Sequence, residues 1–559
     1  MEKMSADSFQ KRAALAAVVL CGVFYFAFLG ARALWDPGEG RYALISREMV
    51  QSGDWLIPRL NGALYFEKPP LAYWLNAAAM RVLGFSEIAA RFFTALAGFL
   101  SVLLAYFFAK RLYGGRTAAL ACAILACSAG FFAWSQIPEL DMLFTLFLCS
   151  GMCLIYAAFE NMCANRALWA HAGYALLGLA CLVKGPAAFA LPLIVFVPYL
   201  LLTDGWRRLR ELYPVTGILL AVAVCAPWFI AISAKEPEFF KFFFIRENFQ
   251  RYSSTMHGRR GQMWYFIPVV IAMMYPWCCA LPAVLASAFK AARRGADRHG
   301  LFLLLWFAMI FAFFSLSGSK RPPYMLPVLI PLAILAARHF SLKWEEGGLL
   351  GAFAAPYAAL NVLLVAGLII VPHYISYLDP GSGINWIAPA AALAWGASLA
   401  LWFASRNSAA GVYAAVAAAQ FAFLGIMYFQ ASGFDKTLSR KAMAQMVMSE
   451  FRPGDKIAAF NADYERNLQS FGYYSGQRVR VIGDQGELQF GAGLDPHRDQ
   501  FFPDYGTLRK WVRSKDRVFI ITKRDRLPEL DFLGKPLYGG KILPGKLVVL
   551  SNRPWGAGK

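Results

Sequence analysis

Runs of roughly 20 nonpolar residues recur along the first 430 residues of the chain, separated by short polar or basic links. Runs of this length match what an α-helix needs to cross the hydrocarbon core of a bilayer. We therefore expect a polytopic α-helical membrane protein with about thirteen transmembrane helices. The expected spans are 12–34, 87–109, 116–136, 139–159, 168–184, 186–203, 214–234, 264–289, 299–317, 322–340, 347–372, 384–404 and 409–430.

Basic residues in the short links predict the topology, because Lys and Arg keep a loop in the cytoplasm. The first run, Ala13–Gly30, is longer than a typical signal-peptide core and has no clear small-residue cleavage site, so we expect an uncleaved first span. With the N-terminus inside, an odd number of spans places the C-terminus outside. The longer polar loops 35–86 and 235–263 then also lie outside.

Both long loops contain mixed polar and apolar segments. In the first loop, Tyr42–Gln51 and Leu71–Leu83 are amphipathic and suit helices that lie in the membrane interface. The second loop places several phenylalanines between 239 and 244 beside Arg246 and Arg251, which also favours an interfacial position.

After Gln430 the pattern changes to that of a small α/β domain. We expect residues 1–432 to form the transmembrane catalytic domain, including both long loops, and residues 433–559 to form a soluble periplasmic domain. Four strands (Lys456–Phe460, Val479–Gly483, Arg517–Lys523, Lys546–Ser551) and two helices (Lys436–Met448, Tyr464–Tyr474) are predicted there.

Composition excludes several other classes of protein. Of the 559 residues, 58% are hydrophobic and only 16% are charged, and the mean hydropathy is +0.46, which argues against a soluble protein. The net charge of +21 comes largely from the basic links, and no nucleic-acid-binding motif is present, so we expect no nucleic-acid partner. All ten cysteines lie in apolar runs or at their edges, which indicates neither a disulfide framework nor a zinc ribbon.

Candidate chemistry concentrates in the first long loop, where Asp36, Glu39, Arg41, Glu67 and Lys68 lie in the strings WDPGEGRYALISREM and LYFEKPPLAYW. A solvated loop explains any one of these residues. The combination of carboxylates, a lysine before a proline pair and aromatic residues beside the membrane favours a functional site.

A second group lies at the predicted outer ends of later spans. Asp141 begins the fourth span, where an ionised carboxylate is expected to face the bundle or a wet cavity, although helix capping also explains it. Lys184, Lys320 and Arg321 break the usual charge bias on the outer side. They are suited to binding an anion, and snorkelling is the ordinary alternative.

His257 is a weak candidate metal ligand in the second loop, with Glu67 as a possible partner, since two ligands need water or substrate to complete a zinc site. No Walker, Rossmann, Ser-His-Asp or paired CxxC pattern is present. A membrane-borne donor therefore fits better than a nucleotide-activated one, and the sequence requires no cofactor.

At these positions the chain resembles the GT-C membrane glycosyltransferases, and most closely the lipid A aminoarabinose transferases that use undecaprenyl phosphate. The resemblance covers the whole chain. It rests on Glu39-Gly40-Arg41-Tyr42-Ala43, Ser46-Arg47-Glu48-Met49, Tyr65-Phe66-Glu67-Lys68-Pro69-Pro70, Asp141, Lys184-Gly185-Pro186, His257 before Trp264-Tyr265, and Lys320-Arg321 with Tyr324 and Pro327.

The resemblance implies a helical bundle in the bacterial inner membrane, with two interfacial helices, a cavity open to the periplasm and a C-terminal α/β domain. It implies a functional carboxylate at Asp141 and a possible zinc site at Glu67 and His257. The residues expected to bind the carrier phosphate are Lys68, Arg41, Tyr65, Arg259, Arg260, Lys320, Arg321 and Tyr324.

One position departs from the family pattern. The family usually has an acidic residue directly before the glutamate of its E-x-R-Y motif, and this chain has Gly38 there. Asp36 or Glu39 is the expected catalytic substitute. A hydroxyl acceptor needs a general base, worth about 10²–10⁴-fold in rate, whereas a lipid A phosphate is already an anion and mainly needs positioning.

We therefore expect a transferase that moves a sugar from undecaprenyl phosphate to lipid A or another envelope acceptor. A GT-C enzyme acting on protein or polysaccharide hydroxyls is the nearest alternative. A transporter of polyprenyl-linked sugars is a further one, although internal repeats and broken midplane helices, which are usual in transporters, are not evident. The sequence leaves open the sugar, the acceptor, the stereochemistry and the oligomeric state.

Overall fold

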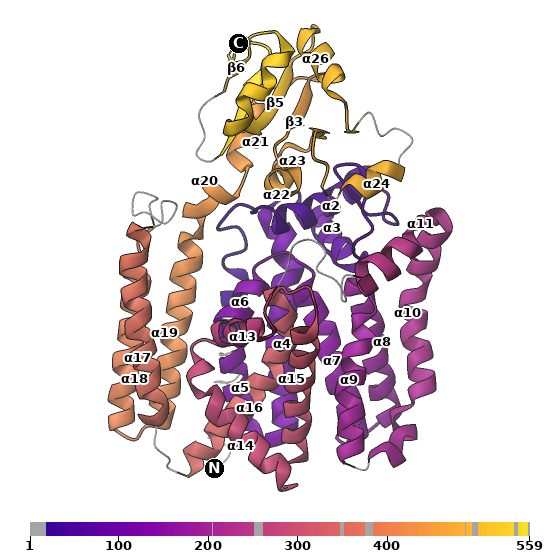
Figure 1. Cartoon of the computed structure of the whole chain (residues 1–559). Coiled ribbons are helices and arrows are strands. Elements are labelled where there is room, and N and C mark those ends of the chain that lie inside the picture. Colours follow the sequence, from indigo (N-terminus) through magenta and orange to yellow (C-terminus); the bar gives the residue numbers. More distant parts are fainter. Residues whose placement is uncertain are drawn as a thin grey trace. The chain divides into compact units, whose positions relative to one another are not determined.

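The computed structural model describes residues 18–203, 205–250, 261–346, 351–374, 384–486, 488–494, 501–540 and 546–556. The chain forms two compact units, which Figure 1 shows coloured along the sequence. The helical unit comprises Met1–Leu29 and Phe93–Gln430, and the α/β unit comprises Gly30–Phe92 and Ala431–Lys559. The prediction placed residues 35–86 in the transmembrane domain, but the structure groups them with the C-terminal residues.

The helical unit consists of long apolar helices joined by short links. Among the described residues, nine helices are long and apolar enough to span a membrane, or eleven if each of two bent pairs counts as one span. The chain is thus a polytopic membrane protein, and the predicted count of about thirteen stays a prediction. The main helices are α4 (Glu87–Tyr113), α5 (Gly115–Cys127), α6 (Ala129–Ser135), α7 (Asp141–Phe159), α8 (Arg166–Lys184), α9 (Ala187–Leu202), α10 (Pro214–Lys235), α13 (Phe266–Met273), α14 (Leu281–Arg293), α15 (Arg298–Leu316), α16 (Leu326–Glu345), α17 (Gly351–Ile370), α18 (Ile387–Ser405) and α19 (Ala409–Phe429).

Shorter helical segments connect these helices. They are η1 (Gly205–Leu212), α11 (Glu238–Phe240), η2 (Lys241–Gln250), η4 (Met263–Tyr265), η5 (Trp277–Ala280), η6 (Pro322–Met325) and η7 (Val371–His373).

Two predicted single spans are broken in the structure. The run 116–136 bends by 64° between α5 and α6, where Ser128 is extended and its hydroxyl donates to the carbonyl of Ile124. The run 264–289 bends by 118° between η4–α13 and η5–α14, with Pro276 in the break. A proline lacks the N–H that would continue the helical hydrogen bonding.

Small residues set the distance between α7 and α8. A Cβ atom built on Gly173 would lie 2.8 Å from the carbonyl oxygen of Gly151, so only glycine fits this contact. Close approach through small residues is a usual way for helices to pack in a membrane. The antiparallel pair therefore brings the beginning of α7 next to the end of α8.

The α/β unit contains a five-stranded sheet in the order β4-β3-β5-β7-β6. Strands β4, β3 and β5 run parallel, whereas β7 pairs antiparallel with both β5 and β6. The core on the sheet includes Ala458, Phe460, Ile520, Leu508 and Val512. The strands are β3 (Lys456–Phe460), β4 (Arg480–Ile482), β5 (Val518–Lys523), β6 (Tyr538–Gly539) and β7 (Leu547–Ser551).

The first long loop of the sequence forms two helices and a small hairpin in this unit. Helix α2 (Gly38–Ser52) packs against α3 (Leu71–Leu83) and α23 (Gln469–Ser475), and strands β1 (Arg59–Leu60) and β2 (Ala63–Leu64) pair between α2 and α3. The remaining helices are η9 (Gln430–Phe434), which begins at the last residue of the helical unit, α20 (Asp435–Leu438), α21 (Lys441–Met448), α22 (Tyr464–Asn467), α24 (Leu488–Leu494), α26 (Tyr505–Arg513) and η10 (Arg524–Leu533).

The four predicted strands and the two amphipathic helices are confirmed as elements, with small changes at their ends. Each of the two predicted C-terminal helices is divided in two. The break at Ser439–Arg440 separates α20 from α21, and the break at Leu468 separates α22 from α23. Strand β6 and helices α24 and α26 had no counterpart in the prediction.

Candidate functional site

The helical unit gathers several predicted site residues at one end of its helices. Asp141 is the first residue of α7 and is almost fully buried, and Lys184 is the last residue of α8. The ammonium group of Lys184 donates a hydrogen bond to the carboxylate of Asp141. Lys184 also lies 4.7 Å from the ring centroid of Tyr324 in η6. A cation–π contact of this kind is attractive.

A second ion pair lies beside the same helix start. Arg321 donates to the carboxylate of Glu139 at 2.8 Å, two residues before Asp141. The structure therefore brings together two of the predicted phosphate-binding residues, Arg321 and Tyr324, with the predicted carboxylate Asp141. The sequence indicated Lys184 as a cation on the outer side that is suited to binding an anion, and the structure shows that it contacts both Asp141 and Tyr324.

Lys320 has a different role from the predicted one. Its ammonium group donates to the carbonyl oxygens of Ser315 at 2.7 Å and Ser317 at 2.9 Å, and lies 3.5 Å from that of Phe314. These are carbonyls at the end of α15, which have no partner within the helix. Burial lowers the pKa of Lys320. The structure thus shows a helix-capping lysine where the sequence predicted a phosphate ligand.

Glu39 is held by two arginines inside the α/β unit. Its carboxylate accepts hydrogen bonds from Arg32 at 2.5 and 2.7 Å and from Arg91 at 3.0 and 3.4 Å. Burial alone would raise the pKa of Glu39, but the two guanidinium groups outweigh burial and lower it to about 2. A carboxylate with such a pKa is a poor proton acceptor near neutral pH, so its geometry favours a structural role over the predicted catalytic one.

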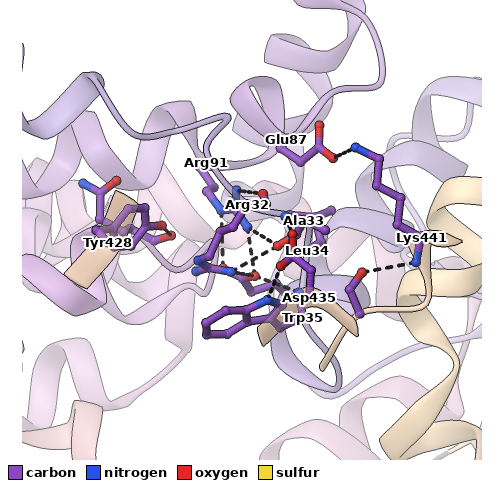
Figure 2. A network of polar contacts seen from close by, with 12 residues as sticks. Arg32, Ala33, Leu34, Trp35, Glu87, Arg91, Tyr428, Asp435 and Lys441 are labelled. Carbon is purple, nitrogen blue, oxygen red and sulfur yellow. Dashed lines mark hydrogen bonds and ion pairs between the residues drawn. The ribbon is translucent and has the colours of Figure 1, made fainter. Parts of the chain in front are cut away.

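Figure 2 shows the surroundings of this ion pair, with Arg32 and Arg91 beside the residues that begin the first loop. Asp435 accepts hydrogen bonds from the backbone N–H of Ala33 at 2.9 Å and from the indole N–H of Trp35 at 2.8 Å. The start of the first loop is thereby fixed to the start of the C-terminal segment.

Asp36, the other predicted catalytic acid, is also engaged by the C-terminal segment. It accepts hydrogen bonds from the backbone N–H of Ser470 at 2.7 Å and from the Ser470 hydroxyl at 2.5 Å. Burial raises the pKa of Asp36 to about 6, although the hydrogen bonds from Ser470 oppose that rise.

Tyr65, Glu67 and Lys68 lie together on the strap between β2 and α3. The hydroxyl of Tyr65 donates to the Glu67 carboxylate at 3.1 Å, and the Lys68 ammonium donates to the Glu67 backbone carbonyl at 2.8 Å. Arg41, by contrast, faces α22 and α23. Its guanidinium lies 3.7 Å from the carboxylate of Glu465 and donates to Gln469 at 3.3 Å.

The second loop contributes the remaining predictions. His257, Arg259 and Arg260 lie outside the described residues, so the proposed pairing of His257 with Glu67 stays a prediction. Within the described part of the chain, no three His, Cys, Asp or Glu side chains are grouped so that they could hold a metal ion. Of the predicted zinc pair, Glu67 lies among the described residues and accepts a hydrogen bond from Tyr65.

The chain matches one family model and several named transferases. Residues 67–230 match the family described as dolichyl-phosphate-mannose-protein mannosyltransferase. An undecaprenyl phosphate-α-4-amino-4-deoxy-L-arabinose arabinosyl transferase 2 of Pseudomonas fluorescens is 35% identical over 376 residues, which are 66% of this chain and 62% of that protein. The protein of the same name from Proteus mirabilis is 34% identical over 381 residues, which are 66% of this chain and 68% of that protein.

A solved structure extends the similarity to the whole chain. The crystal structure of ArnT from Cupriavidus metallidurans bound to undecaprenyl phosphate has a TM-score of 0.84 and 27% sequence identity, and covers 97% of this chain and 98% of that one. The sequence match to the Pseudomonas fluorescens protein spans less than two thirds of that relative's length.

Proposed function

Because the chain belongs to the family of undecaprenyl phosphate-α-4-amino-4-deoxy-L-arabinose arabinosyl transferases, we propose that it transfers a sugar from undecaprenyl phosphate to lipid A or another envelope acceptor. The observation that carries this proposal is the end-to-end structural similarity to a protein crystallised with undecaprenyl phosphate. We propose aminoarabinose or a related sugar as the group transferred, from the names of the relatives.

In the proposed reaction, the bond between the anomeric carbon and the carrier phosphate oxygen breaks, and its electron pair stays on the phosphate. An acceptor oxygen forms the new bond to the anomeric carbon, and a hydroxyl acceptor also loses its proton. Negative charge grows on the carrier phosphate as the first bond breaks. Fixed cations and hydrogen-bond donors aimed at that oxygen lower the barrier.

Arg321 and Tyr324 are our proposed phosphate-binding groups in the helical unit. The guanidinium group of Arg321 is pre-oriented by Glu139, and Lys184 lies against the ring of Tyr324. Lys68 is the proposed phosphate-binding group of the α/β unit, where its ammonium is anchored on the carbonyl of Glu67. An ammonium binds phosphate as a point charge, and a guanidinium can bind it through two parallel hydrogen bonds.

Asp141 is proposed to orient the acceptor or to balance positive charge at the sugar. Its hydrogen bond from Lys184 fixes the carboxylate, so it reaches the reaction already oriented and needs no reorganisation. A phosphate acceptor is an anion at neutral pH and needs no base, which is compatible with the structural roles of Glu39 and Asp36.

We propose the bacterial inner membrane as the location, with the Asp141 end of the bundle and the α/β unit facing the periplasm. The charge pattern supports this orientation, because the basic links 110–116 and 207–210 lie at the end of α7 that is opposite Asp141. There, Arg111 donates to the carbonyl of Met162 and Arg208 donates to the carbonyl of Phe159.

A second candidate has a specific observation in its favour. The match of residues 67–230 to protein mannosyltransferases keeps open a protein hydroxyl as acceptor. That reaction needs a general base, and Asp141 is the carboxylate proposed for it.

The test is a transfer assay with the purified full-length protein in nanodiscs. Extracted polyprenyl-phosphate sugars serve as donors, and lipid A, a polysaccharide and an unstructured Ser/Thr-rich peptide serve as separate acceptors. We expect a mass gain on lipid A equal to one sugar residue. A gain on the peptide alone would replace lipid A with protein as the acceptor, and no gain with any acceptor would overturn the proposal.

A further inference from the structure

Helix α26 presents a strongly basic face on the α/β unit. Leu508 and Val512 are buried against the sheet, whereas Arg509, Lys510 and Arg513 are exposed on the other sides of the helix. Arg509 and Arg513 are four residues apart, so they lie one above the other on the same flank of the helix. In Figure 1, α26 lies at the end of the α/β unit away from α2 and α3.

The two arginines converge on a single glycine. Gly534 ends η10 in the left-handed region, with φ of 62°. A Cβ atom built there would lie 3.1 Å from an Nη2 of Arg513 and 4.0 Å from that of Arg509. The two guanidinium groups are therefore about 7 Å apart or less. The exposed Lys535 follows directly, and its ammonium lies 3.4 Å from the carbonyl oxygen of Val512.

No carboxylate neutralises these three side chains among the described residues. Elsewhere on the same sheet, basic side chains do have such partners, since Arg517 binds Glu450 and Lys456 binds Asp516. The acidic group at the start of α26, Asp504, is used to cap the helix through the N–H of Thr507.

The ordinary explanation of basic residues at a helix end is their attraction to the helix dipole. It accounts for Arg513 in the last turn. It does not account for Arg509 or for Lys535, which belongs to another segment, and like charges four residues apart in a helix destabilise it. An arrangement that brings three cations together without an acid is stabilised when an anion binds between them.

We propose that Arg509, Arg513 and Lys535, hereafter the α26 surface, bind phosphate groups on the saccharide of the acceptor glycolipid. This inference rests on the proposed function. Two converging guanidinium groups match phosphate oxygens, and an exposed surface suits a large polar ligand. Helices α2 and α3 contain the segments that the sequence predicts to lie in the membrane interface, and α26 lies away from them within the unit. The α26 surface is therefore proposed to hold a part of the acceptor that is distant from its lipid end.

The test compares two double variants of the full-length protein in nanodiscs. Arg509→Gln with Arg513→Gln removes two charges from the α26 surface. Lys436→Gln with Arg466→Gln removes two exposed charges elsewhere in the same unit and is the matched control. The probes are lipid A alone, lipid A carrying a phosphorylated oligosaccharide, and the second probe after removal of its saccharide phosphates.

We expect the α26 variant to bind the phosphorylated probe more weakly, by on the order of tenfold, and the control to bind it as the wild type does. Binding of the other two probes should be unchanged in both variants, and the turnover number with lipid A alone should also be unchanged. The loss should shrink at high salt, because exposed charges are screened.

Equal binding of the phosphorylated probe by both variants would overturn the inference. The α26 variant could also lose binding to vesicles of anionic phospholipid as strongly as it loses binding to the phosphorylated probe. In that case the ligand would be the membrane surface and not the saccharide, and the inference would again be overturned. If the wild type transfers no sugar yet binds the phosphorylated probe through these arginines, the proposed function fails while the α26 surface stands as a binding site.

Discussion

The ammonium group of Lys184, at the end of α8, donates a hydrogen bond to the carboxylate of Asp141, at the beginning of α7. The negative charge of Asp141 is therefore paired within the bundle. The ammonium of Lys184 also makes a cation–π contact with Tyr324, 4.7 Å from the ring centroid. This contact joins the predicted carboxylate to a predicted phosphate-binding residue, so a change at either end is expected to reach the other.

Asp141→Asn is expected to lower the transfer rate on the order of 10²-fold, because the amide keeps the shape but not the charge. The variant also leaves Lys184 without its carboxylate partner. The double variant Asp141→Asn with Lys184→Met removes both charges and should regain thermal stability without regaining transfer. Recovery of transfer in the double variant would show that the pair has only a structural role.

Lys68→Ala is expected to raise the KM for the polyprenyl-phosphate donor by about tenfold. The cost in stability should be only about 1 kcal/mol, because the half-buried ammonium donates a hydrogen bond to the backbone carbonyl of Glu67. Lys68→Arg should restore donor use only in part, since a guanidinium has a different shape. The measurement is the transfer rate as a function of donor concentration. If the Ala variant kept the donor KM of the wild type, Lys68 would be removed from the site.

Glu39→Gln is expected to destabilise the α/β unit by about 3–5 kcal/mol, because it leaves the buried Arg32 and Arg91 without their carboxylate. Glu465→Gln is the control, since its pair with Arg41 is longer and partly exposed, and a loss of about 1 kcal/mol or less is expected. Amide hydrogen exchange of β3 and β5 reports the stability of the unit. A Glu39→Gln protein with normal exchange and no transfer activity would restore the catalytic interpretation of Glu39.

The stability of the α/β unit should depend on pH through Asp36. Its pKa in the folded protein is about 6, above the ordinary value of 3.8, so the folded unit binds this proton more tightly than the unfolded chain does. Lowering the pH through 6 towards 3.8 therefore stabilises the unit, by on the order of 3 kcal/mol in full.

Glu39 acts in the opposite direction and at lower pH. Its pKa of about 2 in the folded protein means that its stabilising contribution is lost only as the pH falls below 4.5. Hydrogen exchange between pH 7 and pH 5 should therefore slow in the wild type, after correction for the intrinsic rates. Asp36→Asn should weaken this dependence without abolishing it, because burial also raises the pKa of Glu48 in the same unit to about 7. A wild type whose exchange does not slow would contradict both raised pKa values.

Much of the fold follows from patterns that are local in the sequence. The apolar runs predict the long helices because a bilayer demands length and hydrophobicity. Strand β3 was predicted with its observed ends because its short apolar run is bounded by turn residues, Gly454-Asp455 before it and Asn461 after it. The bends at Ser128 and Pro276 were missed, because a hydropathy pattern does not record where the backbone hydrogen bonding is interrupted. The grouping of 30–92 with the C-terminal residues was missed because it depends on contacts between segments hundreds of residues apart.

The candidate site was predictable in its residue types and less so in their roles. Glu39 and Asp36 were identified as candidate catalytic acids in the first long loop, but their partners Arg32, Arg91 and Ser470 carry no motif that links them in sequence. Lys320 was identified as a cation, and its capping of α15 depends on the chain turning back over its own helix end. The sequence indicated Lys184 by its position before Gly-Pro on the predicted outer side. Its contact with Asp141, which assigns it to the candidate site, became evident only in the structure.

The division of the α/β unit into two separate stretches of chain has a consequence for biosynthesis. Residues 30–92 leave the ribosome about 340 residues before the first of their partners in 431–559. At typical rates of translation that interval is roughly 20–70 s. During it, Asp36, Arg47 and the backbone of Leu34 lack the residues that bind them in the finished protein, namely Ser470, Tyr473 and Tyr474. The nascent first loop must therefore persist unfinished, exposed to proteases and chaperones, until the last quarter of the chain has been made.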